Sequence, residues 1–167
     1  FQLEVQNLGT IGATDAWFEV WSPSPYVSIF NDIDSTNRTI AVGTPFSFIP
    51  QFSVQLEEFI PDQTVIPFLF TLHYGSGLSD TFSLDIVAHA PVLNFVDYQL
   101  IEIDGNGDLL INAGETFELQ VTNENIGHAL LPETTSSLTI HNPLVTIDNP
   151  IQIVPFIDVN DLVTTNY

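Results

Sequence analysis

Apolar and polar residues alternate along most of this chain. The alternation recurs in the short segments Phe1-Leu3-Val5, Phe46-Phe48, Phe52-Val54-Leu56, Phe82-Leu84-Ile86, Phe117-Leu119-Val121 and Leu138-Ile140. Successive side chains of a β-strand point to opposite faces, so this pattern predicts strands with one buried face. Clusters of Gly, Pro, Asn and Asp separate the segments at intervals of roughly ten residues, and no helical period is sustained. The chain is therefore predicted to be all-β, with a β-sandwich architecture.

One stretch of the sequence occurs twice. The segment Phe1–Asn7 reads FQLEVQN, and Phe117–Asn123, 116 residues further along, reads FELQVTN. Later features follow in the same order, because Tyr26–Ile29 has its counterpart in Leu144–Ile147. The length of this repeat is close to that of one immunoglobulin-like domain of about 100 residues. We therefore predict tandem immunoglobulin-like β-sandwiches.

The repeat predicts two domains, residues 1–90 and 91–167. The strand-like segment Leu93–Ile103 precedes the second copy but has no counterpart before the first, so we expect the first sandwich to lack its opening strand. Ile157–Val159 matches Ile40–Val42, and too few residues follow to match the rest of the first copy. The second sandwich is therefore expected to lack its C-terminal strands. Both sandwiches are predicted to be incomplete, with exposed strand edges that further chain would cover.

The most specific chemical signal is an acidic loop, residues Asp104–Glu115. It reads DGNGDLLINAGE and places side-chain oxygens at positions 1, 3, 5, 9 and 12, with a main-chain carbonyl at position 7. This is the ligand spacing of the EF-hand calcium loop, in which the Glu at the last position binds through both oxygens. The predicted ligands are Asp104, Asn106, Asp108, Leu110, Asn112 and Glu115. We predict calcium as the cofactor, with the structural role of stiffening the junction between consecutive repeats.

The acidic loop departs from the EF-hand pattern in two respects. Leu109 stands where that pattern has Gly, and the flanking segments are predicted strands instead of helices. A hairpin turn without a metal is the alternative, since Asp-Gly and Asn-Gly are common turn dipeptides. Converging carboxylates without a basic partner repel one another, and a divalent cation removes that repulsion. The charge therefore favours calcium.

The charge of the chain excludes several classes of partner. Asp and Glu number 21 against a single basic residue, Arg38, which gives a formal net charge of −20. Nucleic acids and anionic membrane surfaces carry the same sign of charge, so neither is an expected partner. No apolar stretch is long enough to span a bilayer. The sequence contains no Cys, which excludes disulfides and thiolate chemistry.

Other candidate chemistry is weaker. The four histidines lie far apart in the sequence, at His73, His89, His128 and His141. They lack the spacing of a zinc motif and are interpreted as surface or strand residues. No Gly-x-Ser-x-Gly motif occurs, and no catalytic residue is assigned. Trp17 and Trp21, with the Phe-rich segment from Phe46 to Phe82, could form a platform for sugars, but the alternation favours core packing.

The acidic loop and the repeat together resemble modules of large secreted Bacteroidota proteins. The residues that carry the resemblance are Asp104–Asp108, Asn112–Glu115, Phe117–Asn123, Gly127, Ala129 and Val145–Ile147. Here Ala113 replaces the usual Pro, and Leu109 the usual Gly. The resemblance implies immunoglobulin-like modules exported by the type IX secretion system, either in adhesins or as accessory domains after gingipain-like cysteine peptidase domains. It also implies an extracellular location, secreted or at the cell surface.

These observations predict a non-catalytic structural or interaction module. We expect a stalk or spacer of a secreted or cell-surface multidomain protein, rigidified by calcium. Its expected partners are neighbouring repeats of the same chain, together with secretion machinery or other surface proteins. Two alternatives remain open: an accessory region of a secreted gingipain-like peptidase, and a carbohydrate-binding adhesin module.

Overall fold

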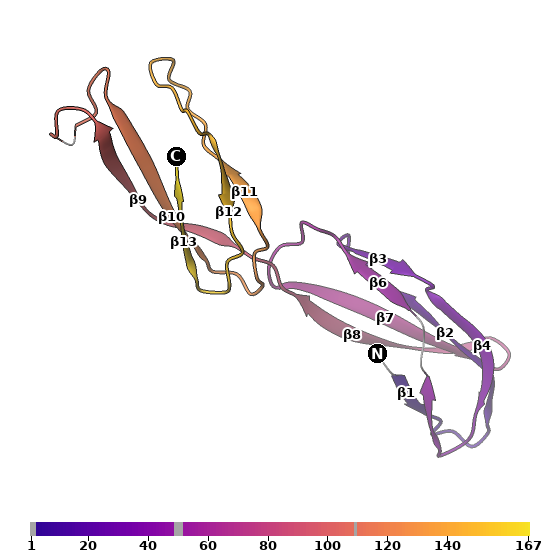
Figure 1. The fold of residues 1–167 in the computed structure, drawn as a ribbon. Helices are drawn as coiled ribbons and strands as arrows, with labels where there is room; N and C mark the ends of the chain where they lie inside the picture. The colour runs from indigo at the N-terminus through magenta and orange to yellow at the C-terminus, as the bar shows by residue number, and fades with distance from the viewer. Residues whose placement is uncertain (1–2, 49–51, 109) are drawn as a thin grey trace. The chain divides into compact units, whose positions relative to one another are not determined.

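The computed structural model describes residues 3–48, 52–108 and 110–167 (Figure 1). These residues form β-strands β1 to β13 and no helix, and the strands pair antiparallel within every sheet. The all-β prediction is therefore confirmed. Two residues used in the sequence analysis, Phe1 and Leu109, lie outside the described part. No helix with the length and apolarity needed to cross a membrane occurs among the described residues.

The chain divides into two compact units. The first unit comprises Phe1–Ile60 and Thr64–Ala88, and the second comprises Pro61–Gln63 and His89–Tyr167. The short segment Pro61–Gln63 thus belongs with the later part of the chain. Whether these units are incomplete immunoglobulin-like sandwiches stays a prediction.

A four-stranded antiparallel sheet is the largest element of the first unit. Its strand order is β4-β2-β7-β8, with bounds Ile33–Ile40, Ala13–Trp21, Thr64–Tyr74 and Leu78–Ala88. Strands β7 and β8 form a long hairpin that is paired from Thr64 opposite Ala88 to Tyr74 opposite Leu78. Gly75 and Gly77 have positive φ angles of 55° and 93°, a conformation that glycine adopts without a steric penalty. The hairpin turn therefore requires these glycines.

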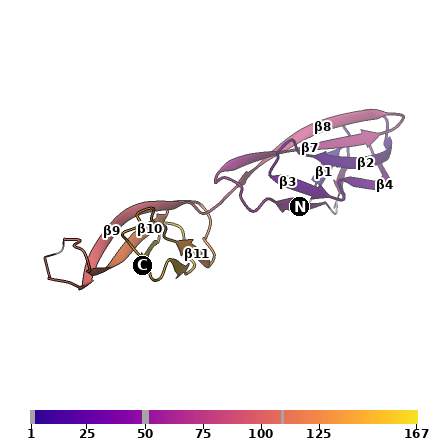
Figure 2. The same ribbon diagram turned by 90° about the horizontal axis from the view of Figure 1, so that it is seen from above.

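Two small sheets cover one face of the large sheet in the first unit. They pair β1 with β5 and β3 with β6, with bounds Leu3–Gln6, Pro45–Phe48, Val27–Phe30 and Ser53–Leu56. Figure 2 shows β1 and β3 on the same side of the large sheet. Leu3 and Val5 pack against the buried cluster that contains Phe18, and Val27 and Ile29 pack against the cluster that contains Phe70. The first unit is therefore a two-layered β structure with its core between the layers.

The alternation in the sequence decides which side chains enter this core. In β2, Ala16, Phe18 and Val20 are buried, and the residues between them face the opposite side of the sheet. Strand β7 does the same with Ile66, Phe68 and Phe70. The period of two in the sequence thus matches the observed burial in both central strands.

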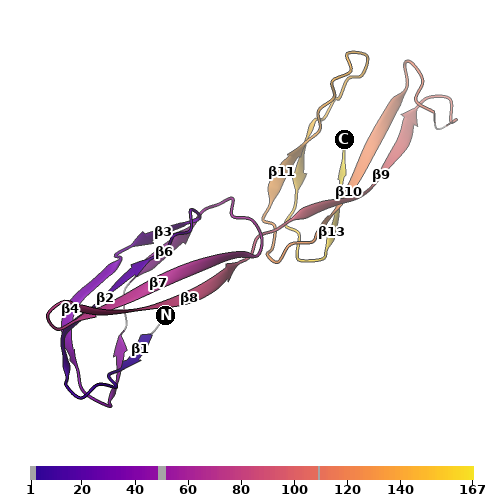
Figure 3. The same ribbon diagram turned by 180° about the vertical axis from the view of Figure 1, so that it is seen from behind.

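The second unit contains a three-stranded and a two-stranded sheet. The larger has the order β13-β10-β9 and the smaller pairs β11 with β12, with bounds Leu162–Asn166, Thr116–Asn125, Leu93–Asp104, Thr134–Ser137 and Ile151–Val154. Figure 3 shows β10 between β9 and β13. The buried apolar residues of this unit, among those described, are Val154 and Ile157. Its core is therefore much smaller than that of the first unit.

An asparagine side chain closes a chain turn in each unit. In the first unit, the Asn7 amide nitrogen donates to the carbonyls of Ile11 at 2.8 Å and Ile40 at 3.2 Å. Its Oδ1 accepts the N–H of Gly9 at 2.9 Å. The Asn7 carbonyl accepts the N–H of Gly43, whose φ is 73°. One side chain therefore satisfies backbone groups both in the turn after β1 and at the end of β4.

Asn125 makes the same set of hydrogen bonds in the second unit. Its amide nitrogen donates to the carbonyls of Ala129 at 2.9 Å and Ile157 at 3.2 Å, and its Oδ1 accepts the N–H of Gly127 at 3.1 Å. Its carbonyl accepts the N–H of Asn160, whose φ is 66°. The pattern found around Asn7 recurs here at corresponding positions.

The shared hydrogen bonds correct the alignment of the repeat. They place Asn7 opposite Asn125, at an offset of 125 − 7 = 118, whereas the sequence comparison placed it opposite Asn123. The physical reason is the turn, in which an Asn side chain accepts the N–H of a Gly two residues later. Asn7 and Asn125 have such a Gly, and Asn123 does not.

Candidate metal-binding sites in the second unit

The acidic loop joins β9 to β10, so the strands of this hairpin hold its two ends together (Figure 1). Thr116 pairs with Asp104 at the mouth of the loop. Inside, the Glu115 carboxylate accepts the N–H of Asn112 at 2.8 Å and that of Asn106 at 3.3 Å. Glu115, the last predicted ligand, therefore lies across the loop from Asn106, the second.

Oxygen atoms converge on the side-chain amide of Asn112. Its nitrogen lies 3.2 Å from the carbonyl oxygen of Leu110 and 3.4 Å from both carboxylate oxygens of Asp108. One oxygen of Glu115 is also 3.4 Å away. The loop therefore gathers four of the predicted ligands, Asp108, Leu110, Asn112 and Glu115, around one point, which the amide nitrogen of Asn112 occupies.

Two carboxylates at the loop do not follow the predicted ligand set, Asp104 and Glu102. Among the described residues, no hydrogen bond joins Asp104 to the other predicted ligands, and the loop carboxylates do not form a group of three within 4.8 Å. Glu102 accepts the N–H of Gly107 at 2.6 Å, so its carboxylate faces the loop. The sequence analysis missed Glu102, although its position two residues before Asp104 on a strand is a usable signal. The calcium shell stays a prediction.

A second cluster of potential ligands combines Asp62, His89 and His128. Nδ1 of His128 lies 2.6 Å from Oδ2 of Asp62, and Nδ1 of His89 lies 4.0 Å from Oδ1 of Asp62. One ligand atom from each of the three residues lies within 4.8 Å of the other two. The Asp62 side chain is 13% exposed, and the imidazoles of His89 and His128 are 50% and 47% exposed. All three residues belong to the second unit.

Backbone hydrogen bonds hold this cluster together. The N–H of Ala90 donates to Oδ1 of Asp62 at 2.9 Å, and the N–H of His128 donates to the carbonyl of Ala90 at 3.1 Å. The Ala90 N–H and the His128 side chain both favour the ionised carboxylate, and they lower the pKa of Asp62 although partial desolvation opposes them. Asp62 is therefore a carboxylate at neutral pH.

The predicted surface position of the histidines agrees with His89 and His128, which are about half exposed, but the two imidazole rings also lie beside one another, which the sequence did not predict. The pairing of the segment around Val92 with that around Ile126 brings them together, and the N–H of Ile126 donates to the Val92 carbonyl at 2.8 Å. No local spacing in the sequence signals this contact. His73, by contrast, lies in β7 of the first unit and stacks on Trp17 with ring centroids 3.9 Å apart.

The outer face of the large sheet in the first unit carries both tryptophans. Trp17 and Trp21 alternate in β2 with the buried residues Phe18 and Val20, and Trp21 is 55% exposed. The core-packing interpretation is therefore wrong for Trp21. The alternation of β2 gives the strand two faces, and Trp17 and Trp21 occupy the face opposite to the core.

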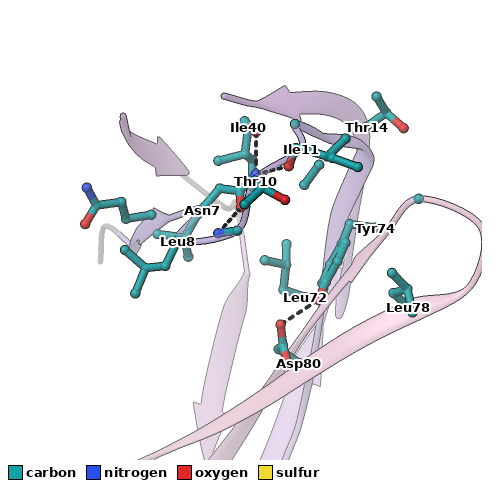
Figure 4. A pocket seen from close by; sticks show the side chains of 16 residues that line it. Asn7, Leu8, Thr10, Ile11, Thr14, Ile40, Leu72, Tyr74, Leu78 and Asp80 are labelled. Atoms are coloured by element: carbon teal, nitrogen blue, oxygen red, sulfur yellow. Dashed lines mark hydrogen bonds between the residues drawn. The ribbon is translucent and has the colours of Figure 1, made fainter. Parts of the chain in front are cut away.

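A pocket of about 630 Å³ lies in the first unit, between the turn that follows β1 and the β7–β8 hairpin (Figure 4). The Tyr74 hydroxyl donates to the Asp80 carboxylate at 2.8 Å. This hydrogen bond stabilises the protonated phenol and raises the pKa of Tyr74. Asp80 is a carboxylate in the lining, and this hydrogen bond engages it. Among the described residues, the pocket lining contains no histidine and no second carboxylate to act with Asp80 in acid–base chemistry.

Comparisons with known proteins add no relative. No protein-family model matches the chain, and neither the curated proteins nor the solved structures give a match.

Proposed function

We propose that this chain is a non-catalytic structural or interaction module, a stalk or spacer of a secreted or cell-surface multidomain protein, in which calcium stabilises the second unit. The observation that carries the proposal is the convergence of oxygens from Asp108, Leu110 and Glu115 on the amide of Asn112. Neighbouring repeats of the same chain are the proposed partners.

Calcium suits this loop because it is a hard cation that takes six to eight oxygen ligands at about 2.3–2.6 Å. The oxygens of Asp108, Leu110 and Glu115 now face the Asn112 amide nitrogen at 3.2–3.4 Å. Rotation of that amide would turn its oxygen toward the same point and add a further oxygen to the set. The formal charge of −20 would attract a divalent cation to the chain.

The fold is compatible with a stalk. It consists of antiparallel sheets in two compact units. Each unit contains the same set of hydrogen bonds around one asparagine, Asn7 or Asn125, and we call this set the asparagine corner. The extracellular location and the resemblance to type IX-secreted modules are part of this proposal. An accessory region of a gingipain-like peptidase would use the same module, and the sequence of the parent gene distinguishes the two.

Thermal unfolding with and without calcium tests the proposal. Binding to the native state must stabilise it, by about 2.7 kcal/mol when free calcium is 100 times the dissociation constant. We expect calcium to raise the melting temperature of the wild type but not of Asp108→Asn. Glu133→Gln, which removes a charge outside the loop in the same unit, is the matched control and should respond like the wild type. An unchanged wild-type melting temperature contradicts the proposal.

A carbohydrate-binding adhesin module is the second candidate function. Trp21 presents an exposed indole ring on the outer face of β2, and Glu19 lies between it and Trp17 on the same strand. Aromatic rings provide apolar faces against which sugars stack. A glycan array probed with the wild type and with Trp21→Ala tests this candidate. Glycan binding that is lost in the variant supports it, and an array without any bound glycan rejects it.

A further inference from the structure

We infer that Asp62, His89 and His128 form a binding site for a zinc-type transition-metal ion, separate from the acidic loop. Two imidazole nitrogens and one carboxylate are a ligand set that zinc uses in proteins, with a fourth position left to water or to another donor. The ligand atoms already lie within 4.8 Å of one another. These three residues therefore offer ligand types that zinc uses, and their ligand atoms lie close to one another.

The backbone around the cluster is fixed before any metal arrives. Ala90 connects all three ligands, because it follows His89, donates its N–H to Asp62 and accepts the N–H of His128. Gly127 allows this close approach, since a Cβ there would lie 2.3 Å from the Ala90 carbonyl oxygen. The backbone therefore holds the three ligands near one another before a metal binds, and this preorganisation reduces the loss of conformational entropy on binding.

A hydrogen-bonded ion pair alone does not account for both histidines. His128 contacts Asp62 directly at 2.6 Å, but His89 remains 4.0 Å away, too far for a hydrogen bond. The two imidazole rings nevertheless stack with centroids 5.5 Å apart. A metal ion can bind an imidazole nitrogen of each ring at the same time. The second histidine therefore favours a metal over a simple Asp–His pair.

Small side-chain rotations would complete the coordination. Zinc–nitrogen and zinc–oxygen bonds of about 2.0–2.2 Å require the ligand atoms to move closer together. The imidazoles of His89 and His128 are about half exposed. The Gln63 amide, which contacts the His128 ring, belongs to an exposed side chain that would move aside, while Asp62 stays anchored to Ala90. Coordination through Nδ1 of His128 requires the neutral ring with its proton on Nε2, so a proton on Nδ1 would pass to Nε2 through the solvent.

The two proposed sites of the second unit prefer different metals. Imidazole ligands suit zinc, copper and nickel, whereas the carbonyl and carboxylate oxygens of the acidic loop suit calcium. The zinc proposal therefore does not depend on the calcium proposal. A chain with Asp108→Asn should lose its response to calcium and keep zinc binding, so the failure of one proposal is distinguishable from the failure of the other.

Calorimetric titration of the chain with zinc chloride tests the inference. We expect one zinc ion per chain, and an affinity at least about tenfold lower in His128→Gln and His89→Gln. His141→Gln removes a histidine from the same unit outside the cluster and should bind like the wild type. Wild-type affinity in the His89 and His128 variants, or no binding to the wild type, would overturn the inference.

A second measurement on the unmodified chain guards against variants that fail to fold. Addition of zinc chloride should shift the imidazole proton resonances of His89 and His128 in the NMR spectrum, and leave those of His73 and His141 in place. Equal shifts of all four histidines, or none, would contradict a site at Asp62, His89 and His128.

Discussion

The two units share an asparagine corner but differ in how they bury it. Asn7 is half-buried beside a core that contains fully buried Phe18 and Phe70. Asn125 is itself completely buried, and the apolar core of its unit contains Val154 and Ile157 among the described residues. The first unit is therefore stabilised mainly by apolar burial, and the second depends more on polar contacts. A small apolar core is the situation in which structural metals contribute most to folding.

Truncation in the core of the first unit should have the largest effect. Phe70 is buried and stacks on Phe82 with ring centroids 5.2 Å apart. Phe70→Ala is expected to lower the free energy of unfolding by about 3–5 kcal/mol. Tryptophan fluorescence during urea denaturation measures this, because both tryptophans are in the first unit. A loss below about 1 kcal/mol would contradict the assignment of this core.

Removal of the two corner asparagines compares the units directly. Asn125→Ala leaves buried donors and acceptors without partners, and we expect it to cost about 2–3 kcal/mol. Asn7→Ala exposes the corresponding groups to nearby water and should cost about 1 kcal/mol. Urea denaturation followed by circular dichroism gives both values. Equal costs would show that burial of the corner makes no difference to its contribution.

The glycines of the two corners give a second matched pair. A Cβ at Gly127 would lie 2.3 Å from the Ala90 carbonyl oxygen and 2.4 Å from the Val92 nitrogen, whereas one at Gly9 would meet Asn7 Oδ1 at 3.1 Å. We expect Gly127→Ala to cost about 1–3 kcal/mol because backbone atoms must move. Gly9→Ala should remain within about 1 kcal/mol of the wild type. A tolerated Gly127→Ala would argue against this close packing.

The smallest effect is expected at alkaline pH in the first unit. The pKa of Tyr74 is raised by its hydrogen bond to Asp80, so the native state holds this proton more tightly than the unfolded chain does. Its contribution to stability is therefore present below the ordinary tyrosine pKa of about 10 and is lost as the pH rises through the raised value. Urea midpoints between neutral and strongly alkaline pH should fall less in Tyr74→Phe than in the wild type. The same fall in both proteins would contradict this role.

The sequence was a good guide to local structure. The alternation at Phe82-Leu84-Ile86 and Phe117-Leu119-Val121 predicted strands, and these segments lie in β8 and β10, because the period of a strand is a local property. The sequence was a poorer guide to which face of a strand is buried. Trp21 was predicted to pack in the core, but it lies on the exposed face of β2. Alternation assigns two faces, and which of them is covered depends on the layer that packs there.

Long-range contacts explain what the sequence analysis missed. Asp62, His89 and His128 meet because Ala90 bonds to both Asp62 and the His128 backbone, a contact between segments distant in the chain. No spacing rule links such positions. The repeat was found from the segment Phe117–Asn123, but its alignment required the turn at Asn125 and Gly127, where hydrogen bonds identify the equivalent residues. The acidic loop was found readily because its predicted ligands lie within one short stretch.

Hydrogen–deuterium exchange with and without calcium tests the central claim most directly, because it reports both units in the same sample. The account predicts slower exchange in residues 104–116 and in the adjoining strands β9 and β10 when calcium is added, with no change in β2 and β7 of the first unit. The same slowing should be absent in Asp108→Asn. Unchanged exchange in the loop, or an equal change in both units, would contradict a calcium site in the acidic loop.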